Sequence, residues 1–242
     1  MNAVPSSQNR KDSCVLLFVK YPEKEQVKHR LAVGLTDEIA VELYRNFVLD
    51  TLSMLESLTV PFYICFYPHT EQKKFFTWLG TQYLFLPQEG TDFGKRMSYC
   101  FQRAFALGCN RVVLIGSDSP DLPGDYLKKA FADLQTQDVV LGPAADGGYY
   151  LIGFRNTTFT ASAFEKIHWS TSTVFEETMR KIMEAKRSVS LLPVWSDVDT
   201  ITDLKNLVLR SENTAFKSSH TITYVRQHNI RLEEDNGAES TT

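Results

Sequence analysis

Residues 111–123 read RVVLIGSDSPDLP, and this stretch decides the expected fold. The four apolar residues that begin at Val112 are typical of a strand buried on both faces of a sheet. The Gly-Ser-Asp that follows ends this run, and Pro123 suits the first turn of a helix because it has no backbone N–H to leave unpaired. The pattern places Asp118 at the carboxyl end of a central strand, where open α/β sheets bind ligands. A simpler alternative is that Asp118 or Asp121 only caps the following helix.

Strands and helices are expected to alternate along most of the chain. Apolar runs predict strands at residues 14–19, 60–67, 83–86, 138–142, 149–154 and 188–194, and helical spacing predicts helices at 36–57, 71–79, 96–107, 123–134, 173–185 and 200–209. Thr36 is a plausible N-cap, and Thr173 with Glu176 and Thr200 with Asp203 have capping-box spacing. Alternation predicts a three-layer α/β/α fold with a mostly parallel, mixed sheet. The strands at 138–142 and 149–154 are too close for a crossover helix, so this pair is expected to be antiparallel.

Composition excludes several classes of protein. The chain has 242 residues, of which 43% are hydrophobic, and a net charge of −3, so no electrostatic feature favours nucleic acid as a partner. The polar start predicts no signal peptide, and no apolar run is long enough for a membrane span. We expect a cytoplasmic protein with a polar leader (1–12), one domain (13–210) and a C-terminal extension (211–242) whose end is disordered. No pattern indicates the oligomeric state.

Basic residues and glycines follow two predicted strands. The first loop carries Lys20, Lys28, His29 and Arg30, and a later loop carries Gly90, Asp92, Gly94, Lys95 and Arg96. Fixed cations suit phosphate oxygens, glycines let a backbone approach a ligand, and a helix N-terminus favours anions. The alternatives are a solvated basic loop and an ordinary joint between a loop and a helix. We expect nucleotide or phosphate binding by Lys20, Lys28, Arg30, Gly94 and Arg96.

Carboxylates follow three other strands. Asp146 precedes Gly147 and Gly148, which either form a tight turn for steric reasons or leave room for a sugar or phosphate. Asp197 and Asp199 also follow a strand, and the alternative for them is a role in the cap of the next helix. Acidic strand ends from distant parts of the sequence, near basic loops, suit a Mg²⁺ or Mn²⁺ ion that bridges a diphosphate. No zinc spacing, nucleophile elbow or Walker A motif is present.

Five motifs occur in an order that resembles a known family. They are K-x-P…V-K-x-R-L (20–31), G-x-D-x-P-x-L-P (116–123), D-G-G-Y-Y-L-I-G (146–153), W-S-T (169–171) and D-V-D-T (197–200). Together, over about residues 14–209, they resemble a bacterial family of GT-A-like glycosyltransferases that includes members named for arsenosugar biosynthesis. This family is similar, more distantly, to nucleotidyltransferases such as phospholactate guanylyltransferase and molybdenum-cofactor guanylyltransferase.

The resemblance implies a fold, a metal site and a phosphate site. It implies a nucleotide-diphosphosugar-transferase fold of the GT-A type, in which Asp118 and Asp199 bind the metal and Lys28 and Arg30 contact phosphate. The first loop departs from the family pattern, with Glu25 where Gly is usual and His29 where Thr is usual. A carboxylate at position 25 would repel phosphate if it pointed inward. Ile201 replaces a frequent proline at the start of the last helix.

The leading hypothesis is a metal-dependent glycosyltransferase that uses a nucleotide-sugar donor and a small-molecule acceptor. Asp118 and Asp199 would hold Mg²⁺ or Mn²⁺, which makes Asp118 catalytic, and Asp146 is the expected base. The sugar or acceptor side is expected to consist of Gly147, Gly148, Tyr149 and Trp169. The alternatives are a nucleotidyltransferase that uses an NTP and releases pyrophosphate, and a non-catalytic nucleotide-binding protein. A nucleotidyltransferase predicts a glycine-rich first loop, but no glycine lies between Lys20 and Val33.

Overall fold

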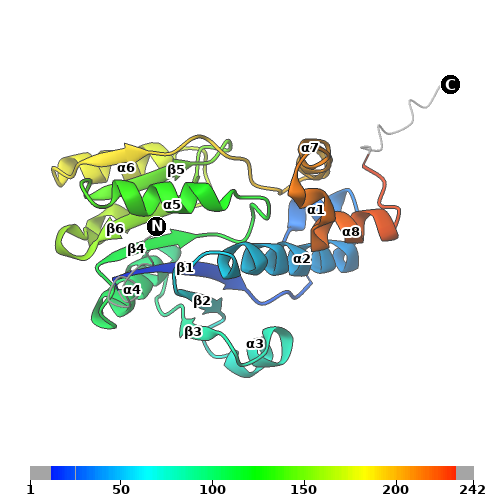
Figure 1. Ribbon diagram of the computed structural model, residues 1–242, viewed down its shortest axis with the longest axis horizontal. Helices are drawn as coiled ribbons and strands as arrows, with labels where there is room; N and C mark the ends of the chain where they lie inside the picture. The colour runs from blue at the N-terminus through cyan, green and yellow to red at the C-terminus, as the bar shows by residue number, and fades with distance from the viewer. Residues whose placement is uncertain (1–11, 25, 233–242) are drawn as a thin grey trace, which may run out of the picture.

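One seven-stranded sheet forms the centre of the protein. The computed structural model describes residues 12–24 and 26–232, so the expectations for residues 1–11 and for the extreme C-terminus lie outside the described residues. The strands are β1 (Ser13–Lys20), β2 (Phe62–Tyr67), β3 (Leu84–Pro87), β4 (Arg111–Ile115), β5 (Val139–Pro143), β6 (Tyr149–Arg155) and β7 (Val189–Leu191). Their order is β3-β2-β1-β4-β6-β5-β7 (Figure 1). Every pair is parallel except those of β6, which is antiparallel to both neighbours, so the expected mixed sheet is confirmed.

Strands β1 and β4 occupy the middle of this sheet. They pair in parallel from Ser13 opposite Arg111 to Leu17 opposite Ile115. Every residue of β1 except Lys20 is buried, and so are the four apolar residues of β4. Successive side chains of a strand point to opposite faces of a sheet, so a strand covered on both faces needs an unbroken apolar run. The prediction of a central strand at residues 112–115 is therefore confirmed.

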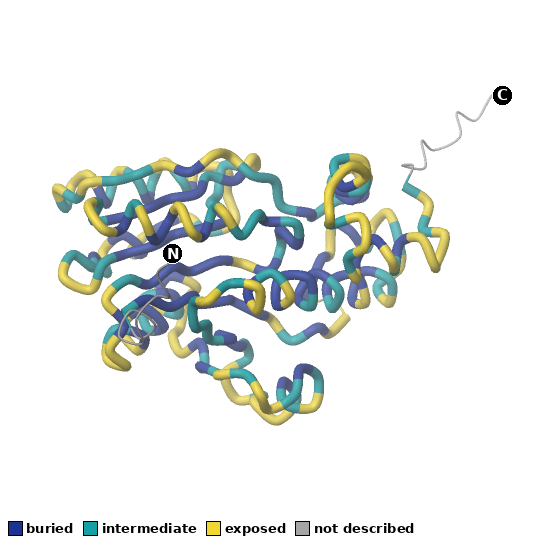
Figure 2. The backbone as a smooth tube through the Cα atoms, viewed as in Figure 1, coloured by how far each residue is buried: buried dark blue, intermediate teal, exposed yellow. Residues whose placement is uncertain are grey.

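Helices cover both faces of the sheet. The α-helices are α1 (His29–Val33), α2 (Asp37–Glu56), α3 (Gln72–Leu79), α4 (Phe93–Ala106), α5 (Gly124–Asp133), α6 (Val174–Glu184), α7 (Ile201–Ser211) and α8 (His220–Gln227). Side chains of α2, α3 and α5 pack on one face of the sheet, and those of α4 and α6 pack on the other. In Figure 2 the strands are coloured mostly as buried and the outer turns of the helices as exposed, as expected for a sheet between two layers of helices. The three-layer arrangement is therefore confirmed. Among the described residues, no helix has the length and apolar character that crossing a bilayer requires.

Helix starts follow the predicted caps in two places and differ in two others. The Thr36 hydroxyl accepts a hydrogen bond from Ile39 N at the start of α2, and Thr200 forms its capping box with Asp203. Helix α6 begins directly after Thr173, as predicted, but the predicted capping box with Glu176 is wrong: Thr173 has helical backbone angles, and its hydroxyl donates to Glu177 instead. Pro123 is the extended N-cap residue of α5, one position before the predicted first turn.

The strand predicted at residues 188–194 is shorter than expected. Only Val189–Leu191 pairs as β7, parallel to β5. The chain then leaves the sheet and returns for a single bridge between Ala144 and Trp195. Pro193 interrupts the segment, because proline has no N–H with which to continue the hydrogen bonds of a sheet.

A C-terminal pair of helices packs against α2. Figure 1 shows α7 and α8 beside α1 and α2, away from α6. Their shared apolar cluster includes Phe47 of α2, Leu204 of α7 and Ile222 of α8. The sequence pattern weakens after Ser211 and did not predict α8, because this helix is short and only three of its residues are buried.

Asp50 attaches α8 to α2, and its replacement is the first test of this packing. Its side-chain oxygens accept hydrogen bonds from His220 N at 2.7 Å and Thr221 N at 2.9 Å, and the residue is 6% exposed. We expect Asp50→Ala to lower the free energy of unfolding by about 2 kcal/mol, because two amides at the start of α8 lose a charged acceptor. Urea unfolding followed by circular dichroism measures this change, and hydrogen exchange of α8 locates it. Asp50→Asn, which keeps one acceptor oxygen, should lose less; equal midpoints for both variants and wild type would contradict the assignment.

Candidate active site

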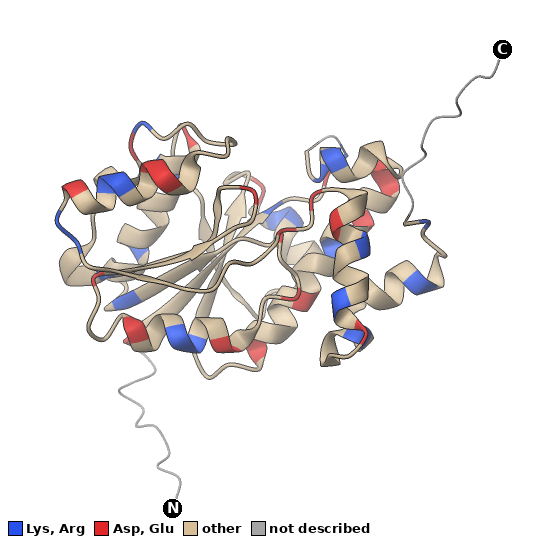
Figure 3. Cartoon of the chain, turned by 90° about the horizontal axis from the view of Figure 1, so that it is seen from above, with Lys and Arg blue, Asp and Glu red and all other residues tan. Residues whose placement is uncertain are grey.

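A cleft of about 830 Å³ lies at the edge of the sheet where the parallel strands end. Lys20 ends β1, Tyr67 ends β2, and Gln88 follows β3. Because β6 runs in the opposite direction, its first residue, Tyr149, reaches the same edge as the end of β4. The volume lies within the range of about 300–1,000 Å³ that is usual for small-molecule sites. Acidic and basic segments come close together where the sheet meets the helices at the right of Figure 3.

Asp118 faces this cleft from the end of β4. Its side chain is 48% exposed, and its backbone oxygen accepts a 2.9 Å hydrogen bond from Val198 N. That bond places the segment with Asp197 and Asp199 directly beside it. The N-cap residue of α5 is Pro123, and no side chain caps this helix, so the capping alternative for Asp118 and Asp121 is excluded.

The Lys28 ammonium lies between the two predicted metal ligands. It forms ion pairs with Asp118 Oδ1 and, at 2.8 Å, with Asp199 Oδ1. Its side chain is only 2% exposed, and Nζ lies 5.5 Å from the centre of the Phe47 ring. Lys28 has φ 53° and ψ 41°, in the left-handed region that few residues other than glycine adopt. The fold therefore holds this cation in a fixed, enclosed position.

Charge and burial oppose each other in this cluster. Burial favours the neutral form of Lys28, but Asp118 and Asp199 more than offset it and raise the pKa of Lys28, which stays cationic. Burial also disfavours ionised Asp199, and the Lys28 ammonium outweighs it and lowers the pKa of Asp199. Burial and the charge of Asp118 raise the pKa of Asp197 to about 7, although the Ser119 hydroxyl donates to it.

The carboxylates can hold a divalent cation under one condition. Asp118 and Asp199 offer hard oxygen donors that converge on one point, and Mg²⁺ commonly takes one or two carboxylates together with substrate phosphates and water. Within residues 12–24 and 26–232 no group of three or more His, Cys, Asp or Glu side chains surrounds a metal position. The donor set fits Mg²⁺ or Mn²⁺ once Lys28 Nζ leaves the point where the two carboxylates converge.

The other basic residues of the first loop lie at the rim of the cleft. Arg30 is 68% exposed, with Nη1 3.8 Å from Asp199 Oδ2. Lys20 Nζ donates a 3.0 Å hydrogen bond to Gln26 O, across the loop. Both residues line the cleft, and both have donors to offer a ligand. His29 is exposed at the start of α1, and Glu25 lies outside the described residues.

Aromatic side chains and Arg96 form the wall toward α4. The Arg96 guanidinium lies over the Tyr67 ring, 4.4 Å from its centre, and 5.5 Å from the centre of the Phe93 ring. Its Nε is buried and has no hydrogen-bond partner among the residues that the structure describes. Trp169 packs edge-to-face on Phe93 with ring centres 5.1 Å apart. The wall therefore offers flat apolar surfaces and one cation for a ligand.

The hairpin between β5 and β6 forms the opposite wall. Asp146 lines the cleft, and its Oδ1 accepts a 2.9 Å hydrogen bond from Gly148 N, which also lines the cleft. Gly147 does not line the cleft: its φ is 91°, and a Cβ there would lie 2.1 Å from Ser172 O. Gly147 thus allows a close packing of two loops.

Gly94 also has a packing role in the structure. A Cβ at this position would lie 2.2 Å from Phe164 O and 3.1 Å from the Trp169 ring. The residue is buried under these groups and does not line the main cleft. Close approach of backbone to protein, rather than to ligand, accounts for this glycine.

Several cleft residues lay outside the sequence prediction. Tyr67 ends β2 and Gln88 directly follows β3, so the strand-end rule that identified Asp118 could also have found them. Tyr44 comes from the middle of α2; its hydroxyl bonds to Ser117 Oγ at 3.0 Å and accepts from Lys20 N at 2.9 Å. Burial raises the pKa of Tyr44 to about 12. No sequence signal separates Tyr44 from an ordinary core residue of that helix.

Solved structures share this fold. A protein from Desulfovibrio desulfuricans G20, named a "putative nucleotide-diphospho-sugar transferase", is 44% identical over 90% of this chain and 95% of its own, with a TM-score of 0.86. The CMP:2-keto-3-deoxy-manno-octonic acid synthetase complexed with CTP is 9% identical over 84% of this chain and 100% of its own, with a TM-score of 0.53. Rv0371c from Mycobacterium tuberculosis H37Rv, in complex with manganese, is 13% identical over 82% and 98%, with a TM-score of 0.50.

The family follows from these comparisons together with the sequence. No curated protein matches the chain. The similarity to the Desulfovibrio protein confirms the expected nucleotide-diphospho-sugar-transferase fold. A model of a bacterial protein family, DUF2064, matches residues 51–171. The chain therefore belongs to DUF2064, which is described as an uncharacterized protein conserved in bacteria.

Proposed function

We propose that this protein is a metal-dependent glycosyltransferase that moves a sugar from a nucleotide-diphosphate-sugar donor to a small-molecule acceptor. The observation that carries the proposal is the convergence of Asp118 and Asp199 on one cationic centre beside the cleft. The name of the 44% identical Desulfovibrio protein supports the same class of donor.

The donor phosphates would bind between the carboxylates and the basic rim. Asp118 and Asp199 would hold Mg²⁺ or Mn²⁺, which supplies positive charge where the leaving diphosphate becomes more negative. Lys20 and Arg30 line the cleft at its rim and would donate hydrogen bonds to phosphate oxygens. Arg96, on the far wall, has donors for the remainder of the nucleotide. The manganese complex of Rv0371c, a protein of the same fold, agrees with this choice of cation.

The acceptor would bind against the hairpin. Asp146 would take the proton of the acceptor hydroxyl while the hydroxyl oxygen bonds to the sugar carbon and the bond from that carbon to the leaving nucleoside diphosphate breaks. The hydrogen bond from Gly148 N orients the Asp146 carboxylate. Trp169 and Tyr149 both line the cleft and offer faces on which a sugar ring can stack. Tyr149 begins β6, and Trp169 packs on Phe93 at the wall toward α4.

A nucleotidyltransferase is the second candidate, and one observation favours it. Proteins of the same fold include the CTP-bound synthetase and an inositol-1-phosphate CTP transferase from T. maritima. Such an enzyme would take an NTP and release pyrophosphate. The first loop, however, has no glycine between Lys20 and Val33 to cradle a triphosphate with bare backbone. A non-catalytic nucleotide-binding protein is the third candidate, and two carboxylates facing the cleft argue against it.

A thermal-shift panel tests these candidates. Nucleotide-sugars and the matching nucleoside triphosphates are added to the full chain with Mn²⁺ or with EDTA. A ligand at one hundred times its dissociation constant stabilises the protein by about 2.7 kcal/mol, which the assay resolves easily. We expect a Mn²⁺-dependent shift with one nucleotide-sugar that exceeds the shift with its triphosphate. A larger shift with a triphosphate would favour the nucleotidyltransferase, and equal shifts with Mn²⁺ and EDTA would remove the metal from the proposal.

A further inference from the structure

A buried ammonium occupies the point at which two carboxylates of the cleft converge. Lys28 Nζ pairs with Asp118 and Asp199, which lie on separate segments of the chain. The two acids are 48% and 35% exposed, whereas the lysine side chain is 2% exposed. A ligand in the cleft can therefore reach the acids directly, but it meets the lysine only behind them.

The backbone conformation and the contacts of Lys28 hold its ammonium beside the two carboxylates. The residue is the N-cap of α1 in a left-handed conformation, and its carbonyl accepts a 2.9 Å hydrogen bond from Ala32 N. The Phe47 ring supports the ammonium from the side of α2. The preceding lysine of the same loop, Lys24, makes an exposed ion pair with Glu38. Enclosure and pairing with the cleft thus distinguish Lys28 from its neighbour.

We propose that Lys28 is the resident counter-ion of the metal position, which a divalent cation must displace in order to bind. The inference rests on the proposed function, because it concerns the cation held by Asp118 and Asp199. An ammonium within hydrogen-bond distance of both carboxylates neutralises them and occupies the space that the ion needs. A divalent cation and the Lys28 ammonium would repel each other strongly if both contacted the same two carboxylates in a partly buried site. The metal can therefore bind only as Lys28 leaves the carboxylates.

Displacement gives Lys28 a second partner. Once released from the acids, its ammonium is free to donate to phosphate oxygens of the donor at the same strand ends. Free metal would bind weakly because it competes with the lysine, whereas metal that arrives with a diphosphate supplies the lysine with new acceptors. Metal and diphosphate would therefore each strengthen the binding of the other, by the same factor.

Direct titration of the full chain with Mn²⁺ alone, followed by electron paramagnetic resonance, tests the displacement. We expect Lys28→Met, which keeps the length of the side chain, to bind Mn²⁺ at least about tenfold more tightly than wild type, since a fixed charge at this distance shifts ionic equilibria by about one to three powers of ten. Lys24→Met removes the same charge from the same loop and should leave the affinity unchanged. Equal or weaker Mn²⁺ binding by Lys28→Met would overturn the inference.

Amine labelling gives a second readout on the unmodified protein. The full chain is treated with an acetylating reagent with and without saturating Mn²⁺, and the Lys28 and Lys24 peptides are compared by mass spectrometry. Lys28 should become severalfold more reactive when Mn²⁺ is present, while the exposed Lys24 stays equally reactive in both samples. Unchanged reactivity of Lys28 at saturating Mn²⁺ would contradict displacement. If Lys28→Met does not fold, Lys28→Gln takes its place in the Mn²⁺ titration.

The outcomes separate this inference from the proposed function. Wild type that binds Mn²⁺ while Lys28 stays shielded refutes the displacement and leaves the metal-dependent transferase standing. Absence of Mn²⁺ binding in wild type and in both Lys28 variants refutes the metal site, and with it the displacement.

Discussion

Asp118→Asn should abolish the Mn²⁺-dependent stabilisation of the protein by its nucleotide ligand. Asp118 faces the cleft, contributes one of the two carboxylates at the metal position, and is not a helix cap. The amide that replaces it has no charge for the cation. Wild type should gain about 2.7 kcal/mol from the active nucleotide-sugar at one hundred times its dissociation constant, and the variant should gain nothing at that concentration. The thermal-shift assay with Mn²⁺ and with EDTA measures both values.

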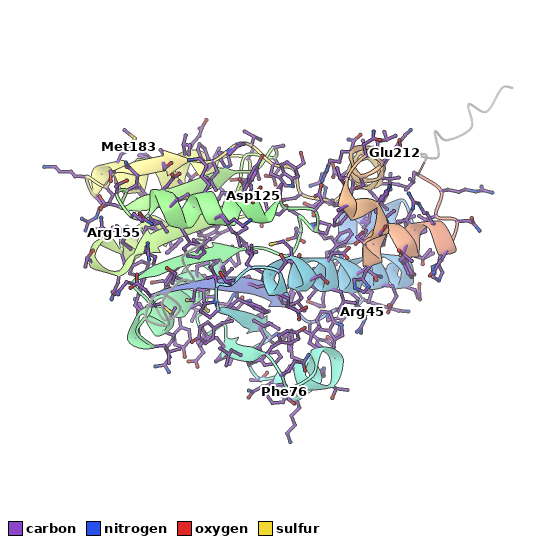
Figure 4. The ribbon with its side chains drawn as sticks, in the orientation of Figure 1. Arg45, Phe76, Asp125, Arg155, Met183 and Glu212 are labelled. Atoms are coloured by element: carbon purple, nitrogen blue, oxygen red, sulfur yellow. The ribbon has the colours of Figure 1, made fainter. Side chains whose placement is uncertain are left out.

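A matched substitution controls for the loss of an acidic side chain. Asp125, labelled in Figure 4, lies on α5 and close to Asp118 in the sequence. Its side chain is 83% exposed. Asp125→Asn should keep the full Mn²⁺-dependent shift. Circular dichroism of Asp118→Asn should match wild type, because Lys28 retains Asp199 as a partner. A full shift in Asp118→Asn would remove Asp118 from the metal site.

Asp121→Ala should lower the free energy of unfolding by about 3 kcal/mol, because it breaks a partly buried ion pair and leaves the Arg210 guanidinium without its charged acceptor. Asp121 is 7% exposed in its side chain and receives two hydrogen bonds from Arg210 of α7, from Nε at 2.6 Å and from Nη2 at 2.9 Å. Trp195 Nε1 donates to the same carboxylate at 3.3 Å. Urea unfolding, with the midpoint and slope compared with those of wild type, measures the change.

The same variant should weaken the candidate metal site. Trp195 precedes Asp197 and Asp199 in the sequence, Arg210 follows them, and both donate hydrogen bonds to Asp121. Asp121 therefore holds the segment between them beside Asp118. In the double variant Asp121→Ala/Arg210→Met the unpaired guanidinium is gone, and we expect part of the lost stability to return. Strictly additive effects of the two substitutions would show that the pair does not stabilise the fold.

The sequence was sufficient for the layers and for the edge that carries the cleft. Unbroken apolar runs at residues 14–19 and 112–115 are required of strands covered on both faces, and that local requirement fixes the central pair. The loop that follows such a parallel strand starts at the ligand edge of the sheet, which explains why Asp118, in the loop after β4, was identified. Thr36 and Thr200 were identified for a similarly local reason, since a cap acts within one turn of its helix.

Properties that depend on distant partners were beyond the sequence. Lys28 and Asp199 are 171 positions apart, and nothing in the sequence of the first loop shows that the Lys28 side chain turns inward. The left-handed conformation of Lys28 has no signal in a residue that usually avoids it. Helix α8 depends on Asp50 of α2, 170 positions away, more than on its own apolar pattern. The packing roles of Gly94 and Gly147 likewise depend on loops that approach from elsewhere.

The separation of Lys28 from Asp199 has a consequence for synthesis. A ribosome makes the N-terminal part of a chain first, so Lys28 leaves the ribosome long before Asp199. The last strand of the sheet, β7, ends at Leu191, before Asp199 is added. The nascent protein can therefore complete its sheet while Lys28 still lacks its second acid. We expect the proposed metal site to be complete only after Asp199 has left the ribosome, so a product truncated before Asp199 would lack one of its two carboxylates.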